Sequence, residues 1–246
     1  EPEVVTEPEV VTTKKENKKT INGKEITYSL HNDYSQCQII DNILTPNYRD
    51  AYQTQFIDIS TSIHKKGIVS LEKSWVVDGT WNNTFEPFRD MTRAEFLKIV
   101  LISHCYTYDR QDAENHPFKD VDINSWQAKV IGKSVELGIA NWDYDINGIS
   151  IFRGNDYISK IEATKILLRM ALLQIWWEPT SLYNDLEVTW HKKYVEQWEY
   201  LGVFNPDTDS YKFQPEWYVS RENMSELLIR VMSLYRDWAD AGDFTQ

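Results

Sequence analysis

Three short blocks of the chain place a basic side chain directly after a hydroxyl residue. They are residues 92–95 (Thr-Arg-Ala-Glu), 159–162 (Ser-Lys-Ile-Glu) and 220–223 (Ser-Arg-Glu-Asn). A Ser or Thr in such a place is typical of a helix start, because its hydroxyl accepts from a backbone N–H that lacks a partner inside the helix. The basic residues would then lie just inside the helix; they are Arg93, Lys160 and Arg221. A helix N-terminus favours anions, so a cation there indicates either a site for an anionic ligand or a solvated ion pair with a nearby carboxylate.

Two other kinds of side chain recur ahead of each block and have a chemistry suited to sugars. The first is an aspartate that follows an aromatic residue and one spacer: Asp58, Asp120 and Asp185. The second is a large apolar residue seven or eight positions after that aromatic residue: Ile63, Trp126 and Trp190. Carboxylates accept hydrogen bonds from sugar hydroxyls, and indole rings stack on sugar rings. The aspartates would equally cap the helix that starts a few residues later, and the apolar side of that helix favours core packing for the tryptophans. Loop tryptophans are further candidates for stacking: Trp81, Trp142 and Trp217.

Signals for metal binding and for catalysis are weak. Residues 143–148 (DYDING) resemble the start of a calcium loop, but Gly154 stands where the closing Glu is needed, so we predict a turn. Residues 205–216 have better end spacing, yet Ser210 replaces the required glycine. The chain contains no G-x-S-x-G, HExxH or phosphate-loop motif. We therefore expect a non-catalytic protein with no metal and no cofactor.

The elements that must position these residues form a threefold internal repeat. In each repeat a first helix ends near Trp75, Gly138 or Gly202, a polar loop follows, and a second helix begins at the hydroxyl–cation block. The glycines suit a left-handed helix cap, whereas Trp75 predicts a different helix end in the first repeat. Apolar residues of each second helix recur at i, i+3, i+4 and i+7, which places one stripe on the helix. They include Phe96, Ile99 and Val100; Ala163, Ile166, Leu167 and Met170; Met224, Leu227, Leu228 and Val231.

One helix pair cannot bury its stripe alone, so the three pairs should pack around a shared core. The predicted fold class is therefore mainly α, with three tandem helix–loop–helix repeats and a short N-terminal β-hairpin around Asn22-Gly23. The predicted boundaries are a Pro/Glu/Lys-rich disordered linker (1–19), the hairpin segment (20–53), repeats 54–104, 116–175 and 181–236, and a tail (237–246). Segment 20–53 either caps the repeats or begins a separate domain.

Charge and composition exclude several classes of function. The formal net charge of −12 is a poor match to nucleic acid, which needs a basic surface. No apolar run approaches the ~20 residues that span a bilayer, so membrane insertion is not expected. The two cysteines, Cys37 and Cys105, are either unpaired thiols or one disulfide, which would imply an oxidising compartment.

The order of these motifs resembles the S-layer-homology family of bacterial surface proteins. The resemblance rests on F-x-D, W-x(11)-G-[IV], F-x-P and a T-R-A-E block, present here as Phe118-x-Asp120, Trp126 to Gly138-Ile139, Phe85-x-Pro87 and residues 92–95. It covers about residues 54 to 236. It implies a pseudo-threefold bundle with grooves between neighbouring repeats, where the basic residue of each block faces an anionic sugar.

The resemblance implies an anchoring module that binds secondary cell-wall polysaccharide, often pyruvylated and attached to peptidoglycan, and an extracellular place in the cell wall or S-layer. Arg93 matches the family block fully, while Lys160 keeps the charge but lacks the planar fork. Arg221 has Glu222 beside it, so its groove is expected to be the weakest. The alternative is a lattice or scaffold protein that contacts other S-layer subunits through its repeats. Unpaired arginines in open grooves would favour the glycan, and arginines held by internal partners would favour the scaffold.

Overall fold

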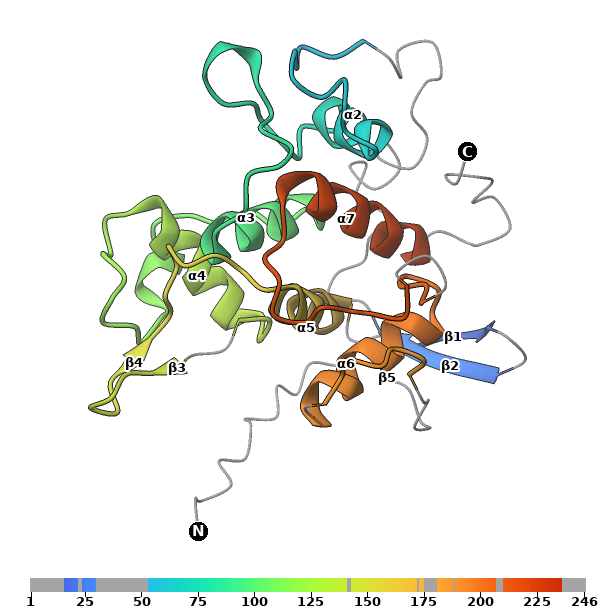
Figure 1. Cartoon of the computed structure of the whole chain (residues 1–246). Coiled ribbons are helices and arrows are strands. Elements are labelled where there is room, and N and C mark those ends of the chain that lie inside the picture. The colour runs from blue at the N-terminus through green and yellow to red at the C-terminus, as the bar shows by residue number, and fades with distance from the viewer. Residues whose placement is uncertain are drawn as a thin grey trace.

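A computed structural model of the chain describes residues 16–21, 24–29, 53–140, 143–171, 173–174, 181–187, 189–206 and 210–235. Within these residues the fold is mainly helical, as predicted (Figure 1). The long helices are α2 (Lys65–Lys73), α3 (Arg93–Ser103), α4 (Trp126–Glu136), α5 (Lys160–Ala171), α6 (Thr189–Tyr200) and α7 (Arg221–Tyr235). Short 3-10 turns are η2 (Trp81–Asn83) and η3 (Asp112–Glu114). Most of the predicted linker and the whole tail lie outside the described residues.

The second helix of each repeat starts where its hydroxyl residue predicts. Thr92 and Glu95 form a full capping box at the start of α3. Ser159 and Glu162 exchange the same two hydrogen bonds at the start of α5. At α7 the Ser220 hydroxyl accepts from Asn223 N at 3.3 Å, without a carboxylate returning the bond. The local sequence therefore fixes three equivalent helix starts.

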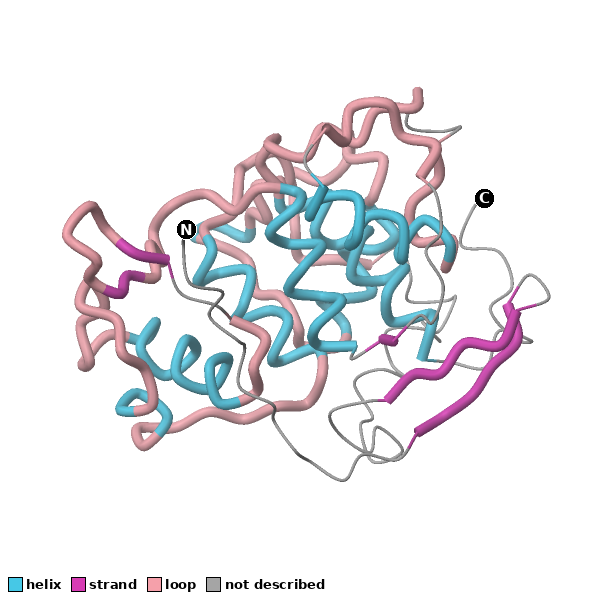
Figure 2. The backbone as a smooth tube through the Cα atoms, turned by 90° about the horizontal axis from the view of Figure 1, so that it is seen from below, coloured by secondary structure: helices cyan, strands magenta, loops and turns pink. Residues whose placement is uncertain are grey.

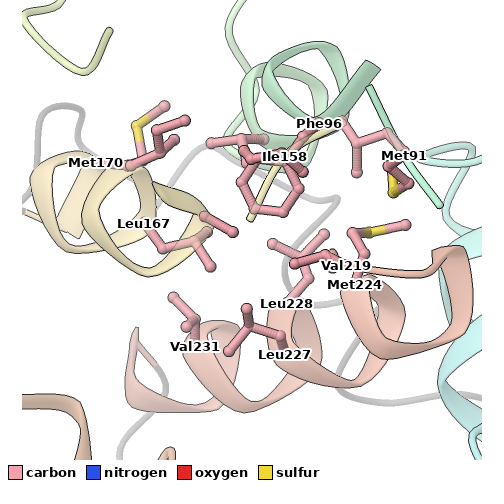
Figure 3. Close-up of a cluster of buried hydrophobic side chains, with 14 of the residues drawn as sticks. Met91, Phe96, Ile158, Leu167, Met170, Val219, Met224, Leu227, Leu228 and Val231 are labelled. Atoms are coloured by element: carbon pink, nitrogen blue, oxygen red, sulfur yellow. The ribbon is translucent and has the colours of Figure 1, made fainter. Parts of the chain in front are cut away.

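The apolar stripes of α3, α5 and α7 face one another and form a shared core (Figure 3). Side chains from all three repeats converge there, including Met91, Phe96, Ile158, Leu167, Met170, Val219, Met224, Leu228 and Val231. Each of these is at most 3% exposed. At ~1.5–3 kcal/mol for each fully buried large apolar side chain, this shared core is the main stabilising element of the fold.

A ring of backbone hydrogen bonds joins the three repeats at the start of these helices. Met91 N donates to Val219 O at 2.9 Å, Val219 N donates to Ile158 O at 3.0 Å, and Ile158 N donates to Met91 O at 2.9 Å. Each repeat thus binds the next, and the third binds the first. We call this the central ring; it gives the molecule its pseudo-threefold symmetry.

The first helices pack on the outside of the second helices and close the same circle. Helix α4 packs on α3 and α6 packs on α5, so a first helix covers the second helix of the preceding repeat (Figure 1). Helix α2 packs on α7, which brings the first repeat against the last. In α4, Gly132 permits a close approach of η3, because a Cβ atom there would lie 1.7 Å from Asp112 O.

The ends of the first helices follow one pattern in all three repeats, so the prediction of a different end at Trp75 is wrong. Trp75 has φ +60°, close to the +69° of Gly138 and +78° of Gly202. Val76 N donates to Leu71 O at 2.9 Å, as in the helix caps that end α4 and α6. The backbone geometry therefore overrides the steric cost of a side chain in the left-handed region.

Two small sheets flank the bundle. Strands β1 (Glu16–Ile21) and β2 (Lys24–Ser29) form the predicted hairpin, and β5 (Leu173–Gln174) adds to β2. The hairpin lies at one edge of the helices (Figure 2) and begins at Glu16, four residues before the predicted boundary at residue 20. Its pairing with β5 attaches it to the second repeat. Strands β3 (Asp143–Tyr144) and β4 (Ser150–Ile151) form the second sheet. Among the described residues, no helix has the length and apolar character needed to cross a membrane.

Candidate functional site

The basic residues of the three blocks occupy equivalent places in the seams between repeats. Each basic side chain lies over a phenylalanine ring of the following repeat, eight residues before that repeat's own basic residue. The basic residue of the third repeat lies over a ring of the first repeat. The distances to the ring centroids are 5.0 Å from Arg93 Cζ to Phe152, 4.4 Å from Lys160 Nζ to Phe213, and 4.4 Å from Arg221 Cζ to Phe85. Cation–π contacts of this kind stabilise the seams by roughly 0.5–2 kcal/mol each.

Arg93 is held by groups of the second repeat. Its Nε donates to Phe152 O at 3.1 Å, and its Nη1 bonds the Glu162 carboxylate. The side chain is 11% exposed, and this burial lowers the pKa of its guanidinium although Glu162 opposes the shift. Arg93 therefore links two repeats through a charge-assisted hydrogen bond.

Arg221 is still more enclosed. Its Nε donates to Phe85 O at 2.6 Å and its Nη2 to Asp78 O at 3.1 Å, both in the first repeat. The residue is 7% exposed, and burial lowers the pKa of its guanidinium. The neighbouring Glu222 carboxylate turns away and accepts from the Ser62 hydroxyl. Arg221 thus fastens the last repeat to the first.

The first backbone N–H groups of α3, α5 and α7 already have hydrogen-bond acceptors, so fewer of them than expected could bind an anion. Arg93 N donates to Asp156 O and Ala94 N to Gly154 O, in the loop of the next repeat. The equivalent N–H groups of α5 donate to Trp217 O and Pro215 O, and those of α7 to Arg89 O and Pro87 O. The expectation that these N–H groups are available to a ligand is therefore wrong, because the neighbouring repeat already accepts from them.

The three repeat aspartates connect the start of each repeat with its loop. Each carboxylate accepts two consecutive backbone N–H groups: Asp58 those of Phe85 and Glu86, Asp120 those of Phe152 and Arg153, and Asp185 those of Phe213 and Gln214. All six distances lie between 2.7 and 2.8 Å. Ser125 caps α4 and no side chain caps α2, so helix capping is not the role of Asp58 or Asp120.

Two of the three large apolar residues of the pattern, Ile63 and Trp126, are not core residues. Trp126 is 47% exposed at the first position of α4, with Lys98 Nζ 5.7 Å from its ring. Ile63 is 86% exposed just before α2. Trp190 belongs to α6, but its side chain is outside what the structure describes. Trp198 of α6 is buried, and its indole N–H donates to Thr164 O at 3.1 Å.

Two of the block cations, Lys160 and Arg93, each line a pocket. Lys160, together with Arg230, Glu226 and His64, surrounds a cavity of about 290 Å³ that we call the Lys160 pocket. Trp217, Tyr218 and Phe204 contribute aromatic walls. The lining contains two basic side chains and one carboxylate, with His64 beside that carboxylate at 3.4 Å. A hydrogen bond from His64, against the effect of burial, lowers the pKa of Glu226 to about 2.

A second cavity of about 680 Å³, the Arg93 pocket, shares Tyr218 with the Lys160 pocket. Its lining combines Arg93 and Arg153 with three carboxylates, those of Asp156, Glu162 and Glu216. Acidic groups outnumber basic ones here, the reverse of the Lys160 pocket. Sequence patterns predict a role for Lys160 and Trp217. They contain no signal for Arg230, His64 or Glu226, which come together only through the packing of α7 against the first repeat.

The calcium-like segment is a turn, as predicted. Asp145 accepts from the N–H groups of Asn147 and Ile149 inside the β3–β4 hairpin. In the part of the chain that is described, no His, Cys, Asp and Glu side chains gather in a set that could hold a metal ion. Two residues of the second calcium-like set, Asp207 and Asp209, lie outside the described residues. Cys105 is disulfide-bonded, so the unpaired alternative is wrong for it; Cys37 also lies outside the described residues.

No protein-family model matches the chain. It is 28% identical over 179 residues to the exoglucanase XynX of Acetivibrio thermocellus, which covers 70% of this chain and 16% of that protein. It is 25% identical over 183 residues to an amylopullulanase of Thermoanaerobacterium thermosulfurigenes, covering 72% of this chain and 9% of that protein. An endo-1,4-beta-xylanase A of Thermoanaerobacterium saccharolyticum is 31% identical over 110 residues, 45% of this chain and 9% of that protein. The chain thus resembles a small part of several named glycosidases.

Proposed function

We propose that the chain is a non-catalytic anchoring module that binds an anionic secondary cell-wall polysaccharide through the Lys160 pocket. The observation that carries the proposal is the composition of this pocket. Two basic side chains, Lys160 and Arg230, lie in one cavity with Trp217 and Tyr218. Arg230 already donates to Glu226 at 2.7 Å and to Val203 O at 3.0 Å, so the positive excess of the lining comes from Lys160. Cations bind a carboxylate of an acidic or pyruvylated sugar, and aromatic walls pack against the apolar face of its ring.

The local charge of the Lys160 pocket explains how a chain of negative net charge could bind an anionic polymer. A chain of net charge −12 repels a polyanion at long range. Salt screens that repulsion beyond a Debye length of about 8–10 Å, so local groups decide the interaction. Because basic groups exceed acidic groups in the Lys160 pocket and not in the Arg93 pocket, we assign the charged sugar to the former.

The comparisons support an accessory role. The relatives bear the names of enzymes that act on polysaccharides, and this chain matches only 9–16% of their length. A module that holds such a protein on the bacterial wall fits a match of this size. The three S-layer-homology-like repeats supply the scaffold, peptidoglycan-attached polysaccharide is the partner, and the place of action is outside the cell.

Co-sedimentation with purified bacterial sacculi tests the proposal. We expect the chain to pellet with untreated sacculi and to stay in solution once the secondary polymers have been extracted with acid. Lys160→Gln, which keeps most of the packing over Phe213, should weaken binding about tenfold, because a charge-assisted hydrogen bond contributes ~1.5–3 kcal/mol. Lys119→Gln is the matched control, since Lys119 is exposed and lines neither pocket.

Two outcomes would count against the proposal. Equal pelleting of Lys160→Gln and Lys119→Gln would remove the Lys160 pocket from the interaction. No pelleting of the unmodified chain with untreated sacculi would rule out the anchor itself.

A surface scaffold that contacts other S-layer subunits is the second candidate. It is favoured by the internal bonding of Arg93 to Glu162 and of Arg221 to Phe85 O, which gives two of the three block cations a structural role. This candidate predicts concentration-dependent self-association without added polysaccharide. Sedimentation velocity over a hundredfold range of protein concentration distinguishes the two, because the anchoring module should keep a constant sedimentation coefficient.

A further inference from the structure

Two tyrosines stand out on the surface above the central ring. Tyr157 and Tyr218 are 50% and 55% exposed, although each directly precedes a central-ring residue that is at most 3% exposed. Successive side chains of extended backbone point to opposite faces, so burial of Ile158 and Val219 directs the tyrosines outward. Their ring centroids are 5.4 Å apart with an interplanar angle of 53°. We call this pair the tyrosine ridge.

The position of the ridge distinguishes it from scattered surface aromatics, which are common in soluble proteins. Tyr218 lines both the Lys160 pocket and the Arg93 pocket, and Tyr157 lines the Arg93 pocket. Tyr218 therefore borders both cavities, and its ring contact with Tyr157 extends the aromatic surface along the Arg93 pocket. The first repeat has Asp90 at the equivalent place, so a tyrosine pair of this kind arises only where the second and third repeats meet.

The chemistry on the Arg93 side of the ridge differs from that of the Lys160 pocket. Carboxylates of Asp156, Glu162 and Glu216 outnumber the basic groups there, which disfavours a second anionic sugar. Carboxylates accept hydrogen bonds from hydroxyl groups, and tyrosine rings pack against the C–H faces of pyranoses while their own hydroxyls stay in water. Such a surface suits uncharged sugar units.

We propose that the tyrosine ridge is a stacking site for uncharged pyranose units of the polysaccharide whose anionic unit occupies the Lys160 pocket. The inference rests on the proposed function and extends it. The polymer crosses the ridge from the Lys160 pocket toward the Arg93 pocket, so the chain recognises a segment of several sugars and not a single terminal unit.

Calorimetric titration with size-fractionated fragments of acid-released wall polysaccharide tests this inference. For the unmodified chain, affinity should rise about tenfold from the shortest binding fragment to fragments of several repeating units, since each further aromatic contact multiplies the binding constant. The variant Tyr157→Ala, which leaves the Lys160 pocket intact because Tyr157 lines only the Arg93 pocket, should lose most of that gain and keep its affinity for the shortest fragment. Substitution of both tyrosines by Phe should retain the gain, because stacking needs the ring and not the hydroxyl.

The matched control is Tyr144→Ala. Tyr144 is 57% exposed and lines neither pocket, so its removal should leave the length dependence unchanged. Circular dichroism verifies that each variant is folded. If the unmodified chain binds short and long fragments equally, or if Tyr157→Ala keeps the gain, the ridge is not a sugar site although the anchor stands. If the unmodified chain binds neither fragments nor sacculi, the proposed function fails and the ridge with it.

Discussion

The aspartate that opens each repeat should be a structural residue, and its replacement by asparagine measures this directly. Each carboxylate accepts two backbone N–H groups at 2.7–2.8 Å. Asparagine has the same shape but only one acceptor oxygen, and its amide N–H₂ would face the second backbone N–H. One charge-assisted bond is lost and one donor loses its partner.

The expected cost is about 2 kcal/mol in the free energy of unfolding, since a hydrogen bond to a charged group contributes ~1.5–3 kcal/mol. For a chain of this size that corresponds to a fall of about 4–8 °C in Tm. Asp58 and Asp185 are half-buried while Asp120 is exposed, so Asp120→Asn should show the smallest loss of the three. Urea unfolding and thermal melting followed by circular dichroism provide the measurement.

Asp122→Asn is the control substitution. Asp122 is exposed and accepts from Asn124 N at 2.9 Å, a turn that the side chain of asparagine also makes, so the change should stay within about 0.5 kcal/mol. Losses below about 0.5 kcal/mol at Asp58 and Asp185 would refute the structural assignment. Loss of sacculus binding in variants that remain fully folded would instead assign these aspartates to the glycan.

The two remaining predictions concern the seam between the last and first repeats and the end of α2. The pKa of Glu226 is lowered to about 2 by the hydrogen bond from His64 and by Arg230, so its stabilisation is complete above the ordinary value of 4.5 and is lost as pH falls toward 2. The difference in unfolding free energy between the unmodified chain and Glu226→Gln should therefore shrink by up to about 3 kcal/mol between pH 6 and pH 2, and parallel pH profiles would contradict this. Trp75→Gly should raise the free energy of unfolding by roughly 1 kcal/mol, because Trp75 is 83% exposed and lies in the left-handed region; a lower Tm would show that its side chain contributes more than the backbone geometry costs.

Much of the fold follows from local sequence patterns. The apolar spacing of the second helices predicts which side chains are buried, and the hydroxyl residues at Thr92, Ser159 and Ser220 predict where those helices begin. Both signals depend on residues within a few positions of each other, where periodicity and capping are strong. The pseudo-threefold arrangement was predicted only through the family resemblance, because the central ring joins backbone groups of different repeats.

The site could be predicted only in part, for a reason that Trp126 and Arg93 illustrate. The repeat pattern predicts that Trp126 packs in the core, because it occupies an apolar position. It lies in the first turn of α4, where one side of the helix is open to solvent, and its ring is half exposed. Arg93 was expected to face a ligand, but Glu162 and Phe152 O, some sixty to seventy positions later, accept its hydrogen bonds. Long-range partners of this kind leave no periodic signal near the residue itself.

The divergence of the repeats explains why one seam differs from the other two. A guanidinium presents several N–H groups in a planar fork, so Arg93 and Arg221 bond a neighbouring carbonyl while lying over the next aromatic ring. The ammonium of Lys160 lies over Phe213 in the same way and also lines a cavity with Arg230 and aromatic walls. If the polysaccharide bound equivalently in all three seams, exchanging lysine for arginine at residue 160 would not change its affinity. If binding depends on the Lys160 pocket, Lys160→Arg should weaken binding although the charge is kept, because the larger guanidinium would occupy part of the cavity of about 290 Å³ that Lys160 lines.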